Sequence, residues 1–339
     1  MLQDIWFFLW GLLWAVYFIT DGFDLGLGMM LPFVGKNEME KRLIYASMGP
    51  LWDGNEVWLI TAGGVTFAAF PKVYAVMFSS LYSPLMLILF GLIIRGVSYE
   101  FREKSKDVSW KRMWDTCMFV GSLLPALILG VAFANIFKGI PIDQNGYFHG
   151  NIFTLLNPYG LLGGILFVLL FMLHGSLWLM IKSSGELYKR AKTVARKFWF
   201  LVLIALIVFV DYSYIATRLF DNYINHPVLF VVLLIAVISF VALKLMIDKE
   251  KEWTCWFLSA LTIVGIVFFG VIGLYPNLFP SSINPDYSLT VYNASSSPLT
   301  LKIMLTVVVI FIPIVLAYQI WAYNMFKGKI GKEELYESY

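Results

Sequence analysis

Long apolar runs, separated by short polar segments, follow one another along the whole chain. Nine of these runs are long enough to cross about 30 Å of hydrocarbon as an α-helix. They cover approximately residues 6–33, 50–70, 74–97, 113–136, 158–181, 198–217, 227–247, 254–275 and 302–325. The pattern therefore predicts a single all-α integral-membrane domain over residues 1–339, a polytopic membrane protein with nine transmembrane helices.

The distribution of basic residues predicts how these helices cross the membrane. If the N-terminus lies outside, 21 of the 25 Lys and Arg residues fall in cytoplasmic segments, which is the bias of the positive-inside rule. We therefore expect the N-terminus outside and the C-terminus in the cytoplasm. Because the first basic residue is Lys36, the first run has no cationic leader and is expected to remain as a spanning helix.

The composition agrees with a membrane protein and argues against several kinds of site. Hydrophobic residues make up 60% of the chain and charged residues 14%, whereas a soluble domain has about 25% charged residues. The sequence has two distant cysteines, Cys117 and Cys255, and no CxxC or Cys/His cluster. We therefore expect no zinc, iron–sulfur or c-type haem site. The net charge of +3 comes from the loops and indicates no nucleic-acid partner.

Four carboxylates lie inside the first two apolar runs, two in each. Asp21 and Asp24 are three residues apart, as are Asp53 and Glu56, so each pair shares one face of its helix. An acid at the centre of a spanning helix costs about 2.5–3.5 kcal/mol, and such acids usually line proton or ion paths. The two helices are antiparallel, and we expect Asp24 to lie near Asp53 and to form a hydrophilic entrance from the cytoplasm.

Structural alternatives remain open for the same acids. Asp53 and Glu56 fall in the predicted first turn of their helix, where carboxylates complement the helix dipole. Asp21 and Asp24 lie too deep for that role. Their alternative is a hydrogen bond to a helix end or an ion pair with a buried arginine, for which Arg95 is a candidate.

One histidine, His174, falls inside a predicted helix. A haem ligand would need an axial partner or an open site that the sequence does not identify. We therefore expect a buried, hydrogen-bonded side chain, and we assign no catalytic, cofactor-binding or metal-binding residue to this chain.

At this point the motifs resemble a known family. Thr20–Gly28 (TDGFDLGLG) and Pro50–Gly64 (PLWDGNEVWLITAGG) are similar to two segments of subunit II of cytochrome bd-type quinol oxidases. The later stretches LYPNLFPSS (274–282) and SLTVYNASSSPLTL (288–301) resemble the last outer loop of that family. The similarity covers essentially the whole chain, and WDGNEVW is its most specific part.

The resemblance implies a place in a respiratory complex of the bacterial cell membrane. The complex oxidises a quinol and reduces O2 to water, and subunit I ligates its haem b and haem d. Subunit II would be the cofactor-free, pseudosymmetric partner, made of two four-helix bundles plus one peripheral helix. A small single-helix subunit often joins the pair.

The resemblance also implies roles for individual residues. Asp53 matches the acid proposed to feed protons from the cytoplasm, and Asp21 and Asp24 match acids near that route. Trp58 matches a tryptophan at an O2 path in some members. Glu56 stands where some members have Gln, and it either joins the proton path or lies beside it.

Two other functions compete with this interpretation. A secondary transporter would also have a buried acidic site, although transporters commonly show inverted repeats that are not evident here. A purely structural partner would use its acids only to stabilise the bundle. If the acids do conduct protons, we expect at least one of Asp21, Asp24 and Asp53 to be protonated at rest, because burial disfavours the charged form.

Overall fold

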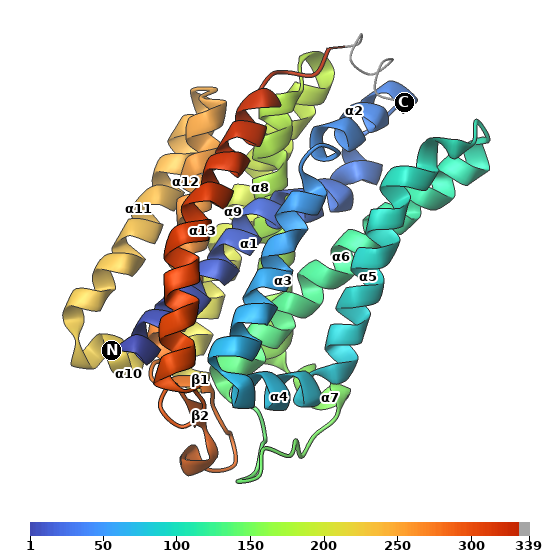
Figure 1. Ribbon diagram of the computed structural model, residues 1–339. Coiled ribbons are helices and arrows are strands. Elements are labelled where there is room, and N and C mark those ends of the chain that lie inside the picture. Colours follow the sequence, from blue (N-terminus) through green and yellow to red (C-terminus); the bar gives the residue numbers. More distant parts are fainter. Residues whose placement is uncertain (332–339) are drawn as a thin grey trace.

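The structure, a computed structural model, describes residues 1–331 and is almost entirely helical (Figure 1). The helices are α1 (Leu2–Val34), α2 (Glu38–Met48), α3 (Trp52–Ala69), α4 (Pro71–Ser80), α5 (Tyr82–Phe101), α6 (Val108–Lys138), α7 (Ile152–Leu155), α8 (Pro158–Lys182), α9 (Gly185–Ala216), α10 (Phe220–Asn225), α11 (Phe230–Asp248), α12 (Glu252–Leu274) and α13 (Pro298–Met325). Two short antiparallel strands, β1 (Asn277–Phe279) and β2 (Leu289–Thr290), precede α13.

Helix α1 lies at the centre of the molecule. It packs against α3 and α6 on one side and against α8 and α12 on the other. The first group of helices is thus α1, α3, α5 and α6, the second is α8, α9, α11 and α12, and α13 crosses the outside (Figure 1). We call the end with α2 the α2 end and the end with α4 and the strands the hairpin end (Figure 1).

Glycines allow α1 to enter the core. A Cβ atom on Gly26 would lie 1.9 Å from the Phe171 carbonyl oxygen, and one on Gly28 would lie 2.0 Å from Ser122 Oγ. These positions accept no side chain, because both contacts are far inside van der Waals distance. The glycine-rich segment therefore lets α8 and α6 approach α1 closely, and α1 ends at Val34 with Gly35 as its cap.

Within residues 1–331, eight helices are long and apolar enough to cross a membrane. They correspond to eight of the nine predicted runs, and the chain is a multi-pass membrane protein. The remaining run, 50–70, forms α3, an 18-residue helix packed against α1. Its carboxylates and glycines make α3 less apolar than the other eight helices, so it is not counted with them. The count of nine spans and the orientation in the membrane stay predictions.

Two local features differ from the sequence prediction. The run 74–97 was expected to be one helix, but the chain breaks at Leu81 between α4 and α5. Pro84 has no N–H to donate to a preceding turn, so a new helix starts instead. The loop before α3 also contains α2, whose start is capped by Asn37, the side chain of which accepts a hydrogen bond from the Glu40 N–H.

Candidate functional site: a buried acid cluster

An ion pair between α1 and α5 forms the centre of the site. Arg95 Nη2 lies 2.6 Å from Asp21 Oδ1, and both side chains are fully buried. The same nitrogen lies 3.4 Å from Glu56 Oε2, whose side chain is 20% exposed. The pairing of an acid of α1 with Arg95, considered from the sequence, is thus confirmed for Asp21. Removing Arg95 would leave the buried Asp21 carboxylate unpaired, which is strongly unfavourable.

The second acid of α1 has a different partner. Asp24 Oδ2 accepts a hydrogen bond of 2.8 Å from Asn55 Nδ2, and Asn55 Oδ1 accepts one of 2.8 Å from the Tyr323 hydroxyl. Asp24 and Asn55 are buried. Residues of α1, α3 and α13 therefore form one continuous hydrogen-bonded chain beside the Asp21–Arg95 pair.

The cluster carries more acid than base. Asp21, Asp24 and Glu56 surround a single guanidinium, that of Arg95. Among the described residues, four buried atoms of the cluster have no hydrogen-bond partner: Asp21 Oδ2, Asp24 Oδ1, Arg95 Nε and Arg95 Nη1. Uncompensated buried charge is expensive, so an arrangement with three ionised carboxylates is unfavourable. The site is suited to holding protons.

Asp53 lies outside this buried cluster. It is exposed on α3, and its Oδ1 accepts a hydrogen bond of 2.7 Å from the Gly54 N–H. The expected contact with Asp24 is not formed among residues 1–331, because Asn55 occupies that place. Residues two apart on a helix point about 200° from each other, so Asp53 and Asn55 cannot both face α1.

Trp58 connects α3 to the peripheral helix. Its ring is 4% exposed, and its Nε1–H donates to Gln319 Oε1 on α13 at 3.1 Å. Gln319 Nε2 lies 3.4 Å from the Gly54 carbonyl oxygen and donates to it. These contacts fix the indole between two helices, two residues beyond Glu56 along α3.

His174 is buried and hydrogen-bonded, as expected. Its Nδ1 lies 2.9 Å from Ser259 Oγ, and its Nε2 lies 3.0 Å from the Ile19 carbonyl oxygen. Because both ring nitrogens have protein partners, the residue does not fit the role of a haem ligand.

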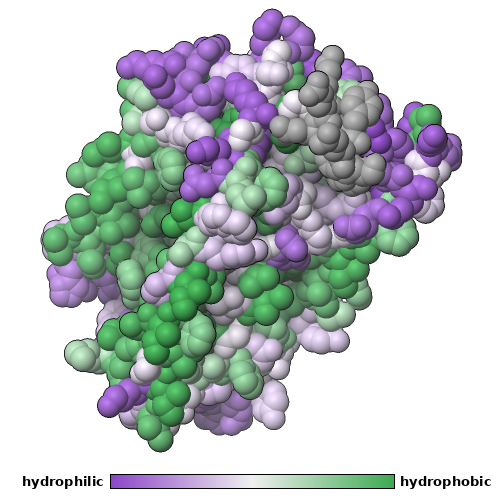
Figure 2. All heavy atoms as spheres, turned by 45° about the horizontal axis from the view of Figure 1, so that its top comes forward, coloured by the Kyte–Doolittle hydropathy of each residue, from purple (hydrophilic) through white to green (hydrophobic). Residues whose placement is uncertain are grey.

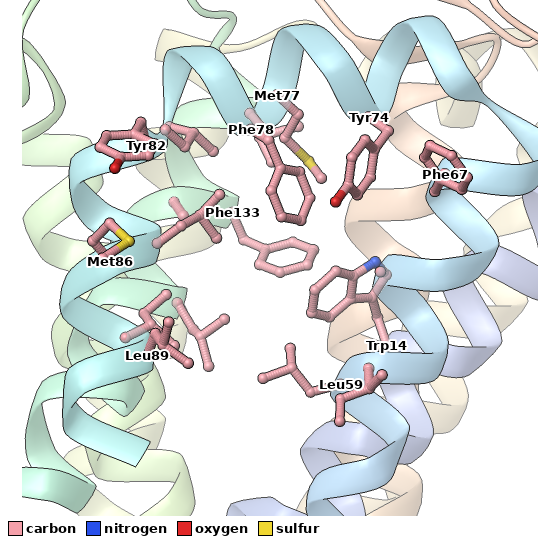
Figure 3. A pocket seen from close by; sticks show the side chains of 18 of the residues that line it. Trp14, Leu59, Phe67, Tyr74, Met77, Phe78, Tyr82, Met86, Leu89 and Phe133 are labelled. Atoms are coloured by element: carbon pink, nitrogen blue, oxygen red, sulfur yellow. The ribbon is translucent and has the colours of Figure 1, made fainter. Parts of the chain in front are cut away.

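The hairpin end contains an apolar cavity that the sequence did not reveal. It has a volume of about 830 Å³ and lies between α3, α4, α5 and α6, with α1 behind it (Figure 3). Its lining includes Trp14, Leu59, Tyr74, Met77, Leu89 and Phe133. The cavity is separate from the acid cluster in its lining residues and suits an apolar molecule or chain.

An ionic network covers the α2 end, which presents many hydrophilic side chains (Figure 2). Its centre is Arg102, which is 1% exposed and pairs with Asp115 at 2.7 Å, with Glu38 at 3.0 Å and with Glu103. Burial raises the pKa of Glu38, but the ion pairs with Arg102 and Lys111 outweigh it and lower the pKa to about 2. The network ties α2 to the ends of α5 and α6.

With this geometry established, comparison with known proteins decides the family. The model of the family "Cytochrome bd terminal oxidase subunit II" matches residues 2–326. The chain belongs to this family. It is 38% identical to cytochrome bd ubiquinol oxidase subunit 2 of Bacillus subtilis (strain 168), over 98% of both chains. It is 36% identical to cytochrome bd-I ubiquinol oxidase subunit 2 of Escherichia coli (strain K12), covering 99% of this chain and 97% of the relative.

A solved structure supports the fold of this subunit II chain. The bd oxidase from Geobacillus thermodenitrificans contains a chain that superposes with a TM-score of 0.77 at 16% sequence identity. The match covers 96% of this chain and 98% of the other. At that identity the likeness shows the helical arrangement alone.

Proposed function

We propose that this subunit II carries protons from the cytoplasm towards a haem-bearing subunit I in a bacterial plasma membrane. Its relatives are cytochrome bd ubiquinol oxidase subunits, and the chain accordingly is a subunit of a terminal quinol oxidase. Reducing O2 to water consumes protons. The observation that carries the proposal is the buried, acid-rich cluster of Asp21, Asp24, Glu56 and Arg95.

The positions of the acids suggest an order for the path. Asp53 is exposed on α3, Glu56 follows one turn later and is partly exposed, and Asp21 and Asp24 are fully buried. Protons would thus enter at Asp53, pass to Glu56 and reach the pair of acids on α1. Arg95 would hold the acids together and balance part of their charge.

The free face of α3 is the proposed contact with subunit I. Among the residues that the structure describes, no packed neighbour lies within 4 Å of a Cβ added to Gly54, Gly63 or Gly64 of this helix. Glycine inside a helix costs about 1 kcal/mol relative to alanine, so glycines without an internal packing reason suggest close approach by a helix of another chain. Asp53 lies on the same side of α3 as Gly64, eleven residues later, and would then open towards the partner.

The cofactors are assigned to the partner on chemical grounds. His174, the histidine within a membrane helix, uses both ring nitrogens inside this chain. We therefore place haem b and haem d in subunit I, with quinol and O2 as substrates of the complex. A small single-helix subunit is a further expected partner. We keep Trp58 as the candidate for an O2 path, since it lies at the α3–α13 contact.

Two alternatives are less well supported. Family membership disfavours a secondary transporter, because the named relatives are oxidase subunits. A purely structural role for the acids is favoured by one observation, the direct Asp21–Arg95 ion pair. That role does not explain why further acids gather around a single arginine.

The test compares Asp53→Asn with wild type in the complex purified with its partner. We expect full haem content but a large loss of quinol-driven O2 consumption. Asp248→Asn is the matched control, since Asp248 is exposed and lies far along the chain in α11. Loss of haem would make Asp53 an assembly residue, and unchanged turnover would remove it from the path.

A further inference from the structure

We propose that Tyr323 is a positioning residue of the acid cluster: its hydroxyl sets the orientation of the Asn55 amide and thereby the proton occupancy of Asp24. The inference deepens the proposed proton path and rests on it. Neither the family motifs nor the spacing of the acids indicates Tyr323, which lies 268 residues after Asn55.

The contacts form an uninterrupted sequence of three side chains. The Tyr323 hydroxyl donates to Asn55 Oδ1 at 2.8 Å, and Asn55 Nδ2 donates to Asp24 Oδ2 at 2.8 Å. Asn55 is 1% exposed and Asp24 is 0% exposed. Water is thus excluded from both residues, and the amide depends on these partners for its hydrogen bonds.

The inward position of Tyr323 is unusual for its helix. Most of α13 is exposed, including neighbouring aromatic residues Tyr318 and Trp321. Tyr323 instead packs edge-on against Phe23 and Trp178, with ring centroids 6.4 and 5.8 Å apart. A phenylalanine would make the same ring contacts, so the hydroxyl serves the hydrogen bond to Asn55.

The chemistry of an amide explains how this hydroxyl affects Asp24. An asparagine presents a carbonyl acceptor on one side and an NH2 donor on the other. With Tyr323 donating to the carbonyl, the NH2 group faces Asp24, and a donated hydrogen bond favours the charged form of a carboxyl group. Without that hydroxyl, the carbonyl is a buried acceptor with no partner, which is unfavourable. Nothing then fixes which end of the amide faces Asp24, so the hydrogen bond that favours the charged carboxylate is weakened and the protonated form of Asp24 gains.

Other charged and titratable groups face Asp24 and remain in place in a Tyr323 variant. They are Asp21 from α1, Glu56 from α3, and Arg95 and Tyr99 from α5. Because these groups do not change, a difference between Tyr323→Phe and wild type reports on the Tyr323–Asn55 contact.

The experiment is infrared titration of the purified complex. The carbonyl band of protonated Asp24 is assigned by its loss in Asp24→Asn. In Tyr323→Phe we expect that band to change frequency and to persist to higher pH, by roughly 0.5–1 pH unit, the effect of one hydrogen bond of about 1 kcal/mol. Quinol-driven O2 consumption should fall several-fold with unchanged haem content.

Tyr318→Phe is the matched control, because it removes a hydroxyl from the exposed face of the same helix. An unchanged band and pH profile in Tyr323→Phe would overturn the inference, as would loss of haem, which would make Tyr323 an anchor of α13. If Asp24→Asn removes no band from the wild-type spectrum, the inference also fails. Full turnover in Asp24→Asn would instead refute the proposed path through Asp24, while the band shift still tests the positioning.

Discussion

Arg95 is the residue on which the charge balance of the site depends. It supplies the one guanidinium among three carboxylates, and it is fully buried. A buried ion pair adds little stability compared with an apolar replacement of both partners, but removing one partner alone is costly. The arginine therefore acts less as a source of stability than as a requirement for keeping Asp21 inside the membrane.

This dependence predicts the effect of Arg95→Gln. Leaving the Asp21 carboxylate without its partner should destabilise the subunit by about 3–5 kcal/mol, measured as a lower thermal unfolding midpoint of the purified complex. Arg112→Gln, which changes an exposed arginine, is the control. If both variants unfold at the same temperature, Asp21 does not depend on the ion pair.

At the residue scale, the sequence revealed the acids but not all of their partners. The expense of a carboxylate in a membrane made Asp21 and Asp24 stand out, and Arg95 was recognisable because it is an arginine near a helix end. Asn55 and Tyr323 are polar residues of ordinary kinds. Their roles depend on the rotation of α3 and the path of α13, which side-chain spacing along the chain does not specify.

At the scale of elements, α2 illustrates what a local signal can provide. Asn37 caps the helix, and Glu40 stands three residues later, which is a recognisable helix start. The apolar pattern did not indicate α2, because α2 is a polar helix between two apolar runs and does not cross the membrane. The α4–α5 break was missed for the opposite reason: its apolar sequence is continuous, and only Pro84 marks the interruption.

The ionic network of α2 predicts a pH dependence of stability. The pKa of Glu38 is about 2 in the folded protein, below its ordinary value of 4.5, so the folded state binds its proton less readily than the unfolded state does. Its stabilising contribution is therefore complete above about pH 4.5 and is lost as the pH falls towards 2. Solvent and salt reduce the size of the effect, since the Glu38 side chain is 48% exposed.

The measurement is the thermal unfolding midpoint of wild type and Glu38→Gln between pH 5 and pH 3. The gap between the two proteins should narrow as the solution becomes more acidic. Glu100→Gln, at an exposed position of α5, controls for the loss of a carboxylate. A gap that stays constant over this range would mean that the ion pairs of Glu38 do not stabilise the fold.

At the scale of the whole molecule, the distribution of glycines separates internal from external contacts. Where α1 meets α8 and α6, glycines are needed because neighbouring atoms leave no room for a side chain. The glycines of α3 have no such neighbours within residues 1–331. A sequence alone does not distinguish these two groups, since both lie in apolar helices. The structure does so, and it leaves α3 and α13 as faces available to another chain.

The free glycines of α3 therefore predict the outcome of Gly64→Leu. Within residues 1–331 a Cβ atom at this position meets no packed neighbour within 4 Å, so the subunit itself should fold and insert as wild type does. If a helix of the partner subunit packs closely here, the leucine should hold the two chains apart and reduce the amount of haem-bearing partner that co-purifies. Gly328→Leu, also at an open position, should have no such effect. Normal co-purification of Gly64→Leu would place the interface elsewhere and leave the α3 glycines without an explanation.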